Sequence, residues 1–420
     1  MKLAKISLAT LVALGAFSSV ASATPLEEAI KNVDVSGMAR YRYTNTNTEE
    51  AVGSKTGAGH QFKFIANFKA AIDDNFFGVI GLRYNKTDGT GSQDKDYNTD
   101  KTNVNNDSNL GIHQFYLGYT YANTTITAGK QTLGTFFTDD AIGTGVKVLN
   151  KDVEGLTLAA IVFDGLENDK QESDGGLYDF EAVTGKAANE NVRTLSVYDA
   201  GNLYGVAAIG SYDPISFQLW YASLENLTDL LALELAGDFD VTNDVNIGFK
   251  GQFVNSDANS DIKNAGKALG FDYNDGKFYA GELSGEFFGV SATAGYIGYD
   301  VKNKGMTSFS LEDQGSLIDV AEQFSDKVGD YTLAEGKGNF WFAKLGYGID
   351  KFKFSVDYVA GTVKYTGGNE TDYQEVMPAV AYQYNKKLKF STFYSWANYD
   401  KKGEPDRDSQ KYRFEARYSF

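Results

Sequence analysis

The last ten residues of the chain alternate between two kinds of side chain without interruption. Residues 411–420 read KYRFEARYSF, and every second residue, from Tyr412 to Phe420, is apolar or aromatic. Because successive side chains of a strand point to opposite faces, this segment predicts a strand with one aromatic and one charged face. A soluble sandwich would turn the apolar face inward. A strand of this length that ends on an aromatic residue fits a membrane-spanning barrel better.

The same alternation recurs along the whole chain and is interrupted by turns of two kinds. Long polar stretches cover residues 85–110, 165–191, 301–338 and 399–409. Between them, short turns are predicted near Asp73, Asn123, Lys151, Asp213-Pro214, Asp240, Phe288, Asp350 and Lys386. Short periplasmic turns and longer outer loops are typical of outer-membrane barrels. Eight short turns that join strands in pairs, with one more strand at each end, predict an all-β, transmembrane antiparallel β-barrel of about 18 strands.

The N-terminal residues have the pattern of a secretory signal peptide. Lys2 and Lys5 form a basic start, residues 6–20 are almost entirely apolar or small, and Ala21-Ser22-Ala23 supplies the cleavage pattern. The apolar run is shorter than the ~20 residues of a membrane-spanning helix. The prediction is therefore a signal peptide at residues 1–23 and one outer-membrane barrel domain at residues 24–420, exported through the periplasm to the cell outer membrane.

Composition and charge exclude several functions. The chain has no Cys and only two His, and it carries no G-x-S-x-G, P-loop or H-E-x-x-H motif. An enzyme is therefore not expected. The net charge of −17 becomes −19 once Lys2 and Lys5 are removed, which argues against nucleic-acid binding because that requires a basic surface. No apolar run after residue 23 is long enough for a transmembrane helix. A closed barrel in the lipid bilayer is the remaining way to cross a membrane.

Several sequence blocks resemble one family from end to end. They are TPLEEAIKNVDVSG at 24–37, RYRY at 40–43, AGKQ at 128–131, GTGVKV at 143–148, GLTLAA at 155–160, GNLYG at 201–205, LEDQG at 311–315 and the C-terminal strand. Together they resemble the Campylobacter-type major outer membrane porin. The resemblance implies an 18-stranded homotrimeric barrel that passes ions and small hydrophilic solutes by passive diffusion, with a preference for cations. It also implies a calcium ion held by acidic residues at the constriction.

Four arginines are predicted to lie together on the inner wall. Arg40 and Arg42 belong to the first strand, and Arg413 and Arg417 to the last strand. The first and last strands must be neighbours when a barrel closes, so these guanidinium groups are expected to form one basic patch that lines the pore. Lys130 and Lys147 are further candidates for the patch. Structural pairing of the arginines with nearby carboxylates is an equally open interpretation.

The acidic side of the constriction is predicted on a short, partly aromatic loop. Residues 133–142 read LGTFFTDDAI, and in porins the third loop typically folds into the barrel. Asp139 and Asp140 would then face the arginines across the channel and set up a transverse field. This loop is shorter than in the family, which has an acidic residue further on. Asp139 or Asp140 is therefore only a possible substitute as a calcium ligand.

The other predicted calcium ligands lie on two long loops. Glu312, with Asp313 beside it, matches the acidic position of the LEDQG block, and Asp174 lies in the acidic stretch 167–179. Calcium takes six to eight oxygen ligands, and carboxylates from separate loops supply them. The alternative is that these acids are simply solvated loop residues.

Two other functions remain open at this stage. A substrate-specific outer-membrane channel would show saturable transport, and a surface adhesin would bind host surface molecules through its long loops. A soluble secreted β-protein is the last alternative.

Overall fold

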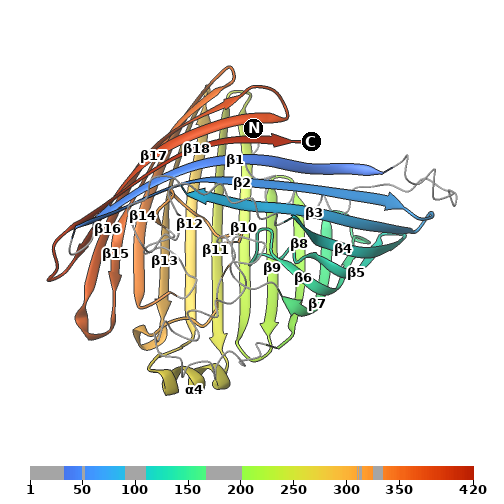
Figure 1. Ribbon diagram of the computed structural model, residues 1–420, viewed down its shortest axis with the longest axis horizontal. Coiled ribbons are helices and arrows are strands. Elements are labelled where there is room, and N and C mark those ends of the chain that lie inside the picture. Colours follow the sequence, from blue (N-terminus) through green and yellow to red (C-terminus); the bar gives the residue numbers. More distant parts are fainter. Residues whose placement is uncertain are drawn as a thin grey trace.

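The chain forms a single closed barrel of 18 antiparallel strands in a computed structural model (Figure 1). The structure describes residues 33–49, 53–89, 110–166, 201–309, 311, 315–324 and 334–420. Each strand pairs with its neighbours in sequence, and β1 (Asp34–Glu49) also pairs with β18 (Arg407–Ser419), which closes the sheet. The predicted barrel and its count of about 18 strands are confirmed.

The remaining strands follow in order around the wall. They are β2 (Ser54–Ala71), β3 (Phe76–Gly89), β4 (Leu110–Tyr121), β5 (Thr124–Thr132), β6 (Ile142–Asn150), β7 (Leu156–Leu166), β8 (Leu203–Tyr212), β9 (Ile215–Leu224), β10 (Thr228–Thr242), β11 (Val245–Ala258), β12 (Gly276–Phe287), β13 (Val290–Val301), β14 (Lys337–Ile349), β15 (Phe352–Lys364), β16 (Glu370–Gln383) and β17 (Leu388–Lys401). Short 3₁₀ turns, η3 (Lys302–Lys304) and η6 (Thr366–Gly368), follow β13 and β15.

The predicted short turns coincide with the observed strand connections at every position except one. Asp240 was expected in a turn but lies inside β10, and the turn comes after Thr242. The reason is that β10 continues to pair with β11 beyond Asp240, through a small irregularity in register. Both described ends of the chain lie on the short-turn side of the barrel. This is the periplasmic side, because short turns mark that end in outer-membrane barrels.

The two faces of the wall differ as the alternation predicts. On the outside, large apolar side chains such as Leu117, Leu233 and Trp341 remain exposed. On the inside, polar side chains such as Lys63 and Glu234 are buried against loops that enter the barrel. An apolar outer band around a polar lumen is the arrangement of a transmembrane barrel.

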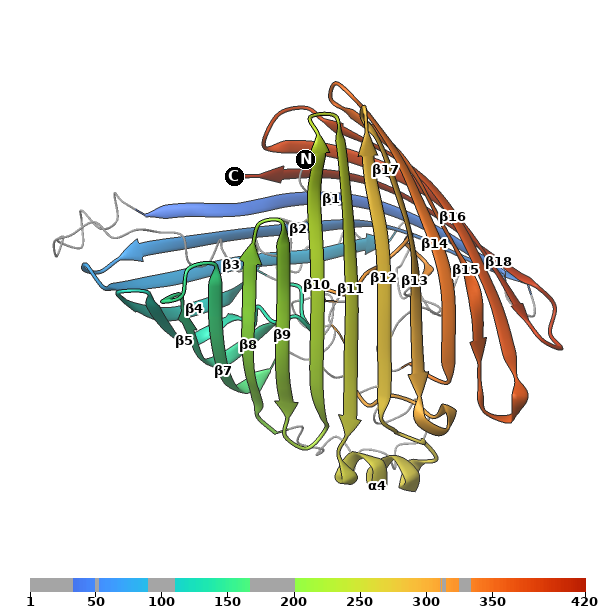
Figure 2. The ribbon, with the colours of Figure 1, turned by 180° about the vertical axis from the view of Figure 1, so that it is seen from behind.

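The lumen is partly filled by a hydrophobic core. Inward side chains such as Trp220 of β9 and Phe340 of β14 are almost fully buried, and they cluster with Phe309 and Phe324 of the long connection between β13 and β14. A helix, α4 (Ser260–Leu269), lies at the end of the barrel opposite the termini (Figure 2). Its Asn259 N-cap accepts a backbone hydrogen bond, and Gly270 ends it in the left-handed conformation. No helix among the described residues is long and apolar enough to cross a membrane.

Candidate functional site

Strand register brings the four predicted arginines together at the seam where the barrel closes. Arg40 of β1 lies opposite Arg417 of β18 on one side and Lys63 of β2 on the other. Arg42 lies opposite Glu415, the residue midway between Arg413 and Arg417. All four face the lumen because the alternating residues of β1 and β18 are aromatic and face outward. We call this surface the seam wall.

Two of the seam arginines form close ion pairs with carboxylates. Arg42 Nε is 2.7 Å from Glu415 Oε2. Arg413 Nη2 is 2.6 Å from Glu322 Oε1, and Lys411 Nζ is 3.0 Å from the same oxygen. Structural pairing, which the sequence left open, therefore occurs at Arg42 and Arg413. Each pair reduces the positive charge that the seam wall presents to the lumen.

The two lysines considered for the patch lie elsewhere. Lys130 lies opposite Phe115 on β4, whose side chain is 61% exposed, so Lys130 is on the outer face of the barrel. Lys147 faces inward and is buried, and its Nζ donates to the Thr132 carbonyl at 2.8 Å. Lys147 therefore stabilises the end of β5, where the loop to β6 begins, and is not part of the arginine patch.

The loop between β5 and β6, residues 133–141, folds into the lumen and is called the inner loop here. Leu133, Phe136 and Phe137 are almost fully buried, and the Leu133 N–H donates to the Ala141 carbonyl at 2.9 Å, which closes the loop. Burial of its three large apolar side chains holds the inner loop against the core on one side of the lumen.

The two adjacent acids of the inner loop have different surroundings. Asp140 Oδ2 is 2.8 Å from Lys63 Nζ and 2.9 Å from Arg83 Nη2. The Asp140 carboxylate is therefore in direct contact with cations of β2 and β3, which the sequence did not indicate; it was expected to face the four seam arginines across the channel. Asp139 instead lines the cavity described below.

A second segment, residues 315–324, also crosses the lumen and is called the strap. Sequence analysis predicted a long polar outer loop at 301–338 and did not predict that part of it enters the barrel. Its first end meets the inner loop, where the Ser316 N–H donates to the Phe136 carbonyl at 2.8 Å. Beside it, Gln252 of β11 accepts from the Ile318 N–H and donates to the Ser316 carbonyl, each at 2.7 Å.

The other end of the strap is anchored to β16 and β17 by a buried carboxylate. Glu375 is 1% exposed and accepts hydrogen bonds from the Glu322 and Gln323 N–H groups, from Ser395 Oγ at 2.6 Å and from Tyr373 OH at 2.7 Å. The Gln323 side chain donates to Ser395 Oγ and accepts from Ser409 Oγ, each at 2.6 Å. Several donors thus stabilise this carboxylate without a cation. Glu375 is the sixth residue of β16, and nothing in the sequence around it indicated that this strand acid binds a loop.

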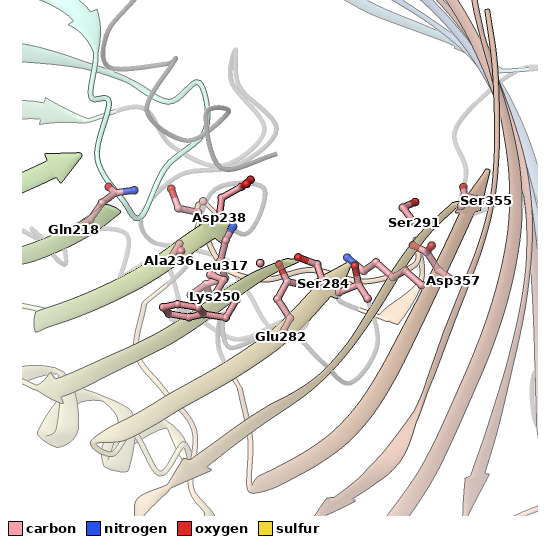
Figure 3. A pocket seen from close by; sticks show the side chains of 18 of the residues that line it. Gln218, Ala236, Asp238, Lys250, Glu282, Ser284, Ser291, Leu317, Ser355 and Asp357 are labelled. Carbon is pink, nitrogen blue, oxygen red and sulfur yellow. The ribbon is translucent and has the colours of Figure 1, made fainter. Parts of the chain in front are cut away.

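The inner loop and the strap leave a cavity of about 570 Å³ against the wall of β9 to β15. We call this side of the lumen the far wall. Figure 3 shows Asp238, Lys250, Glu282 and Asp357 along it. Lys344 and Lys353 also line the cavity, and Lys344 Nζ donates to the Asp319 carbonyl of the strap at 2.6 Å. Asp238, Glu282 and Asp357 form no ion pair within 4 Å among the described residues.

The surroundings of the predicted calcium ligands differ in whether they suit a divalent cation. Asp140 does not fit a calcium site, because two cationic side chains already contact its carboxylate and would repel a divalent cation. Within the described parts of the chain, no three acidic or histidine side chains come together as a metal site. Glu312, Asp313 and Asp174 lie outside the described residues, as do the predicted signal peptide 1–23 and the whole acidic stretch 167–179. Calcium binding therefore stays a prediction that rests on Glu312 and Asp174.

Several solved structures share this architecture, among them the outer membrane protein OprD from Pseudomonas aeruginosa. Pseudomonas aeruginosa OccK8 (OprE) is 14% identical with a TM-score of 0.67, and 92% of this chain covers 98% of that one. Pseudomonas aeruginosa OprD is 14% identical with a TM-score of 0.63, and the match covers 96% of this chain and 98% of that one. Acinetobacter baumannii OccAB3 is 12% identical with a TM-score of 0.64, and the match covers 92% of this chain and 99% of that one. At these identities the likeness shows the fold alone. The comparison with curated proteins gave no match.

A closed 18-stranded barrel with an apolar outer band and a charged lumen defines the class of outer-membrane porins. The model of one family, described as Campylobacter major outer membrane protein, matches residues 1–420. The chain belongs to this family, as the sequence blocks indicated. It is a channel of the outer membrane and not an enzyme.

Proposed function

We propose that this porin is a general-diffusion channel for ions and small hydrophilic solutes and that it prefers cations. The observation that supports this is an imbalance in pairing between the two sides of the lumen. On the seam wall, Glu415 and Glu322 neutralise Arg42 and Arg413. On the far wall, Glu282 lies opposite Lys250 and Asp357 lies opposite Lys344 in the strand register, but neither carboxylate is within 4 Å of a cation among the described residues. Carboxylates that are not held in a close ion pair raise the local concentration of cations beside the cavity.

The test is a bilayer measurement of reversal potential under a potassium chloride gradient. The doubly substituted Glu282→Gln, Asp357→Asn channel is expected to lose about half or more of its cation preference, because a unit charge a few ångströms from the ion path is worth about 1 kcal/mol in water. Asp406→Asn, an exposed substitution on the β17–β18 connection, is the control with one charge removed outside the lumen. An anion-selective wild-type channel would contradict the proposal.

The same recordings distinguish a general pore from a substrate-specific channel. A general pore gives ion current that rises in proportion to salt concentration, and neutral sugars reduce it only by filling volume. A current that saturates with one solute would favour the substrate-specific alternative, for which the mixed Asp238, Lys250 and Asp357 lining supplies binding groups.

The homotrimer is part of the proposal. Lys130 lies on the outer face of β5 among exposed apolar side chains of β4, where a cation in contact with lipid costs up to about 2–4 kcal/mol at the bilayer midplane. A neighbouring subunit over this face would remove the lysine from lipid. Native mass spectrometry of the detergent-extracted protein tests it, and a monomeric mass would contradict it.

Calcium at the constriction and binding of host surface molecules through the outer loops are further predictions. A chelator that changes the single-channel conductance would support the calcium site at Glu312 and Asp174. Host binding would use the long outer loops, of which residues 90–109 and 167–200 lie outside the described part of the chain, and a pull-down with the intact barrel tests it.

A further inference from the structure

A hollow on the outer surface of the barrel has a composition that differs from the rest of the apolar band. It measures about 280 Å³ and lies over β15 to β18. Tyr358, Trp396 and Val376 form its apolar part and are 45%, 45% and 37% exposed. The sequence neighbours of these residues, such as Glu375 beside Val376 and Ala397 beside Trp396, are buried inside the barrel. Because side chains alternate along a strand, the hollow faces away from the lumen.

Polar side chains stand directly beside the aromatic ones. Gln374, Asn398 and Asp408 occupy the next row of paired residues toward the outer loops. The Asn398 side-chain amide donates to Asp408 Oδ1 at 2.9 Å, and Tyr394 OH donates to Gln410 Oε1 at 2.8 Å. Among the described residues, the Gln374 amide and the Trp396 indole N–H have no hydrogen-bond partner. The hollow therefore offers both an aromatic platform and free donors and acceptors.

The position of the hollow along β15 to β18 indicates which layer of the membrane it faces. The polar row lies toward the connections 365–369 and 402–406, and the short turns at 350–351 and 384–387 lie at the other end of the same strands. Short turns mark the periplasmic end. The hollow therefore lies at the level where the apolar band meets the outer-leaflet headgroups, which in bacterial outer membranes are those of glycolipids.

The chemistry of the hollow fits a sugar ring better than a phosphate. A sugar presents C–H groups on its faces, which pack on the electron-rich faces of Trp and Tyr, and hydroxyls at its edge, which pair with amides and carboxylates. Asp408, with Asp372 and Asp400 paired across β16 and β17 in the row above, would repel a phosphate. The volume is near the lower end of the ~300–1,000 Å³ of small-molecule sites, which suits one ring.

We propose that this outward hollow of β15 to β18 binds a sugar of an outer-leaflet glycolipid, stacked on Trp396 and hydrogen-bonded by Gln374, Asn398 and Asp408. An aromatic belt alone would explain Trp396 and Tyr358. It would not explain a recess whose rim is built from two amides and a carboxylate.

The test measures glycolipid retained by the intact protein. Full-length barrel is reconstituted in nanodiscs of phosphatidylethanolamine and phosphatidylglycerol that contain rough-type lipooligosaccharide, and the lipids bound per barrel are counted by native mass spectrometry. Asn398→Leu and Trp396→Leu are each expected to lower lipooligosaccharide retention about tenfold, the effect of losing one or two hydrogen bonds or a stacked ring. Retention of phosphatidylglycerol should not change.

Matched controls make the same substitutions elsewhere on the outer face. Asn255→Leu on β11 and Trp341→Leu on β14 should retain glycolipid as the wild type does. Heat-modifiable migration and unchanged single-channel conductance show that each variant is folded, and conductance should be unaffected because the hollow faces away from the lumen. Wild-type retention in both hollow variants, or equal loss in the controls, would overturn the proposal. Loss of the oligomer together with the glycolipid would also overturn it, because the hollow would then be a contact between subunits.

Discussion

The seam wall is mainly cationic and the far wall carries both acids and lysines, but the two walls differ more in how closely their charges are paired. On the seam wall, Arg42, Arg413 and Lys411 are within 3.0 Å of carboxylates. On the far wall, Asp238, Glu282 and Asp357 have no such partner among the described residues. The electric field in the pore therefore depends on which charges are closely paired, and the arginines counted in the sequence are a poor measure of it.

Acids of the same kind have different roles on the two walls. Glu322 and Glu375 hold the strap, whereas Glu282 faces the cavity. Asp357 also faces the cavity, but its carboxylate accepts a hydrogen bond from the Ala321 N–H of the strap. A carboxylate with two to four donors within 3.2 Å is part of the framework, and its removal changes pore shape. A carboxylate with none among the described residues, such as that of Glu282, is available to a passing ion. Variants of the two kinds should therefore have separable effects, one on conductance and the other on selectivity.

The largest expected effect comes from removing the anchor of the strap. Glu375→Ala leaves at least four buried donors without an acceptor, at about 1–3 kcal/mol each, so the strap should detach from β16. Single-channel recordings should show higher mean conductance and greater current noise. Asp372→Ala, on the outer face of the same strand, is the control. An unchanged, quiet conductance in Glu375→Ala would mean that the strap does not limit the pore.

An intermediate effect is expected from releasing the paired cations of the seam wall. Glu322→Gln leaves Lys411 and Arg413 facing the lumen without their shared carboxylate. The ion pair is partly exposed, so the change is about 0.5–1 kcal/mol, and the cation-to-anion permeability ratio should fall roughly two- to fivefold. Reversal potentials measure it. Glu404→Gln removes the same charge from an outer connection, where Glu404 pairs with Lys401 and Arg407, and should leave the ratio as it was. Equal shifts in both variants would show that pairing on the seam wall is unimportant.

The smallest effect concerns acid stability outside the pore. Burial alone would raise the pKa of Asp275, but the hydrogen bond and charge of Lys263 outweigh it and hold this pKa below its ordinary value of 3.8. A lowered folded-state pKa stabilises the fold above the ordinary pKa, and this contribution is lost as pH falls through and below 3.8. Because the pair is partly exposed, it is worth at most about 1 kcal/mol.

Hydrogen exchange in α4, which Lys263 belongs to, measures that contribution. Protection of α4 should decline as the solution is acidified below about pH 4, and Asp275→Asn should remove this dependence while lowering protection at neutral pH. Asp244→Asn, at an exposed turn on the opposite end of the barrel, is the control. A pH dependence that persists in Asp275→Asn would assign it to another group.

The outer surface and the closure of the barrel were predictable because they depend on a local period. Alternation at residues 411–420 and in the first strand specifies which side chains face lipid, and strand pairing in a closed sheet then makes β1 and β18 neighbours. The adjacency of Arg40 to Arg417 follows from these two facts. The family blocks gave the class of protein for the same reason, since they lie mainly on strands.

The lining of the lumen was only partly predictable. The sequence indicated that residues 133–142 fold into the barrel. It did not indicate that Asp140 contacts Lys63 and Arg83, or that the strap enters the lumen. The contacts of Glu375 with Gln323 join residues 52 positions apart, and no short motif encodes them.

The barrel, its number of strands, its outward face and its family could be predicted from the sequence, because a period of two residues and antiparallel pairing between sequence neighbours are local properties. The pairing of the lumenal charges, the course of the strap and the shape of the cavity could be known only from the folded chain. These depend on where long loops come to rest inside the barrel, and that is settled by packing and hydrogen bonds between distant residues.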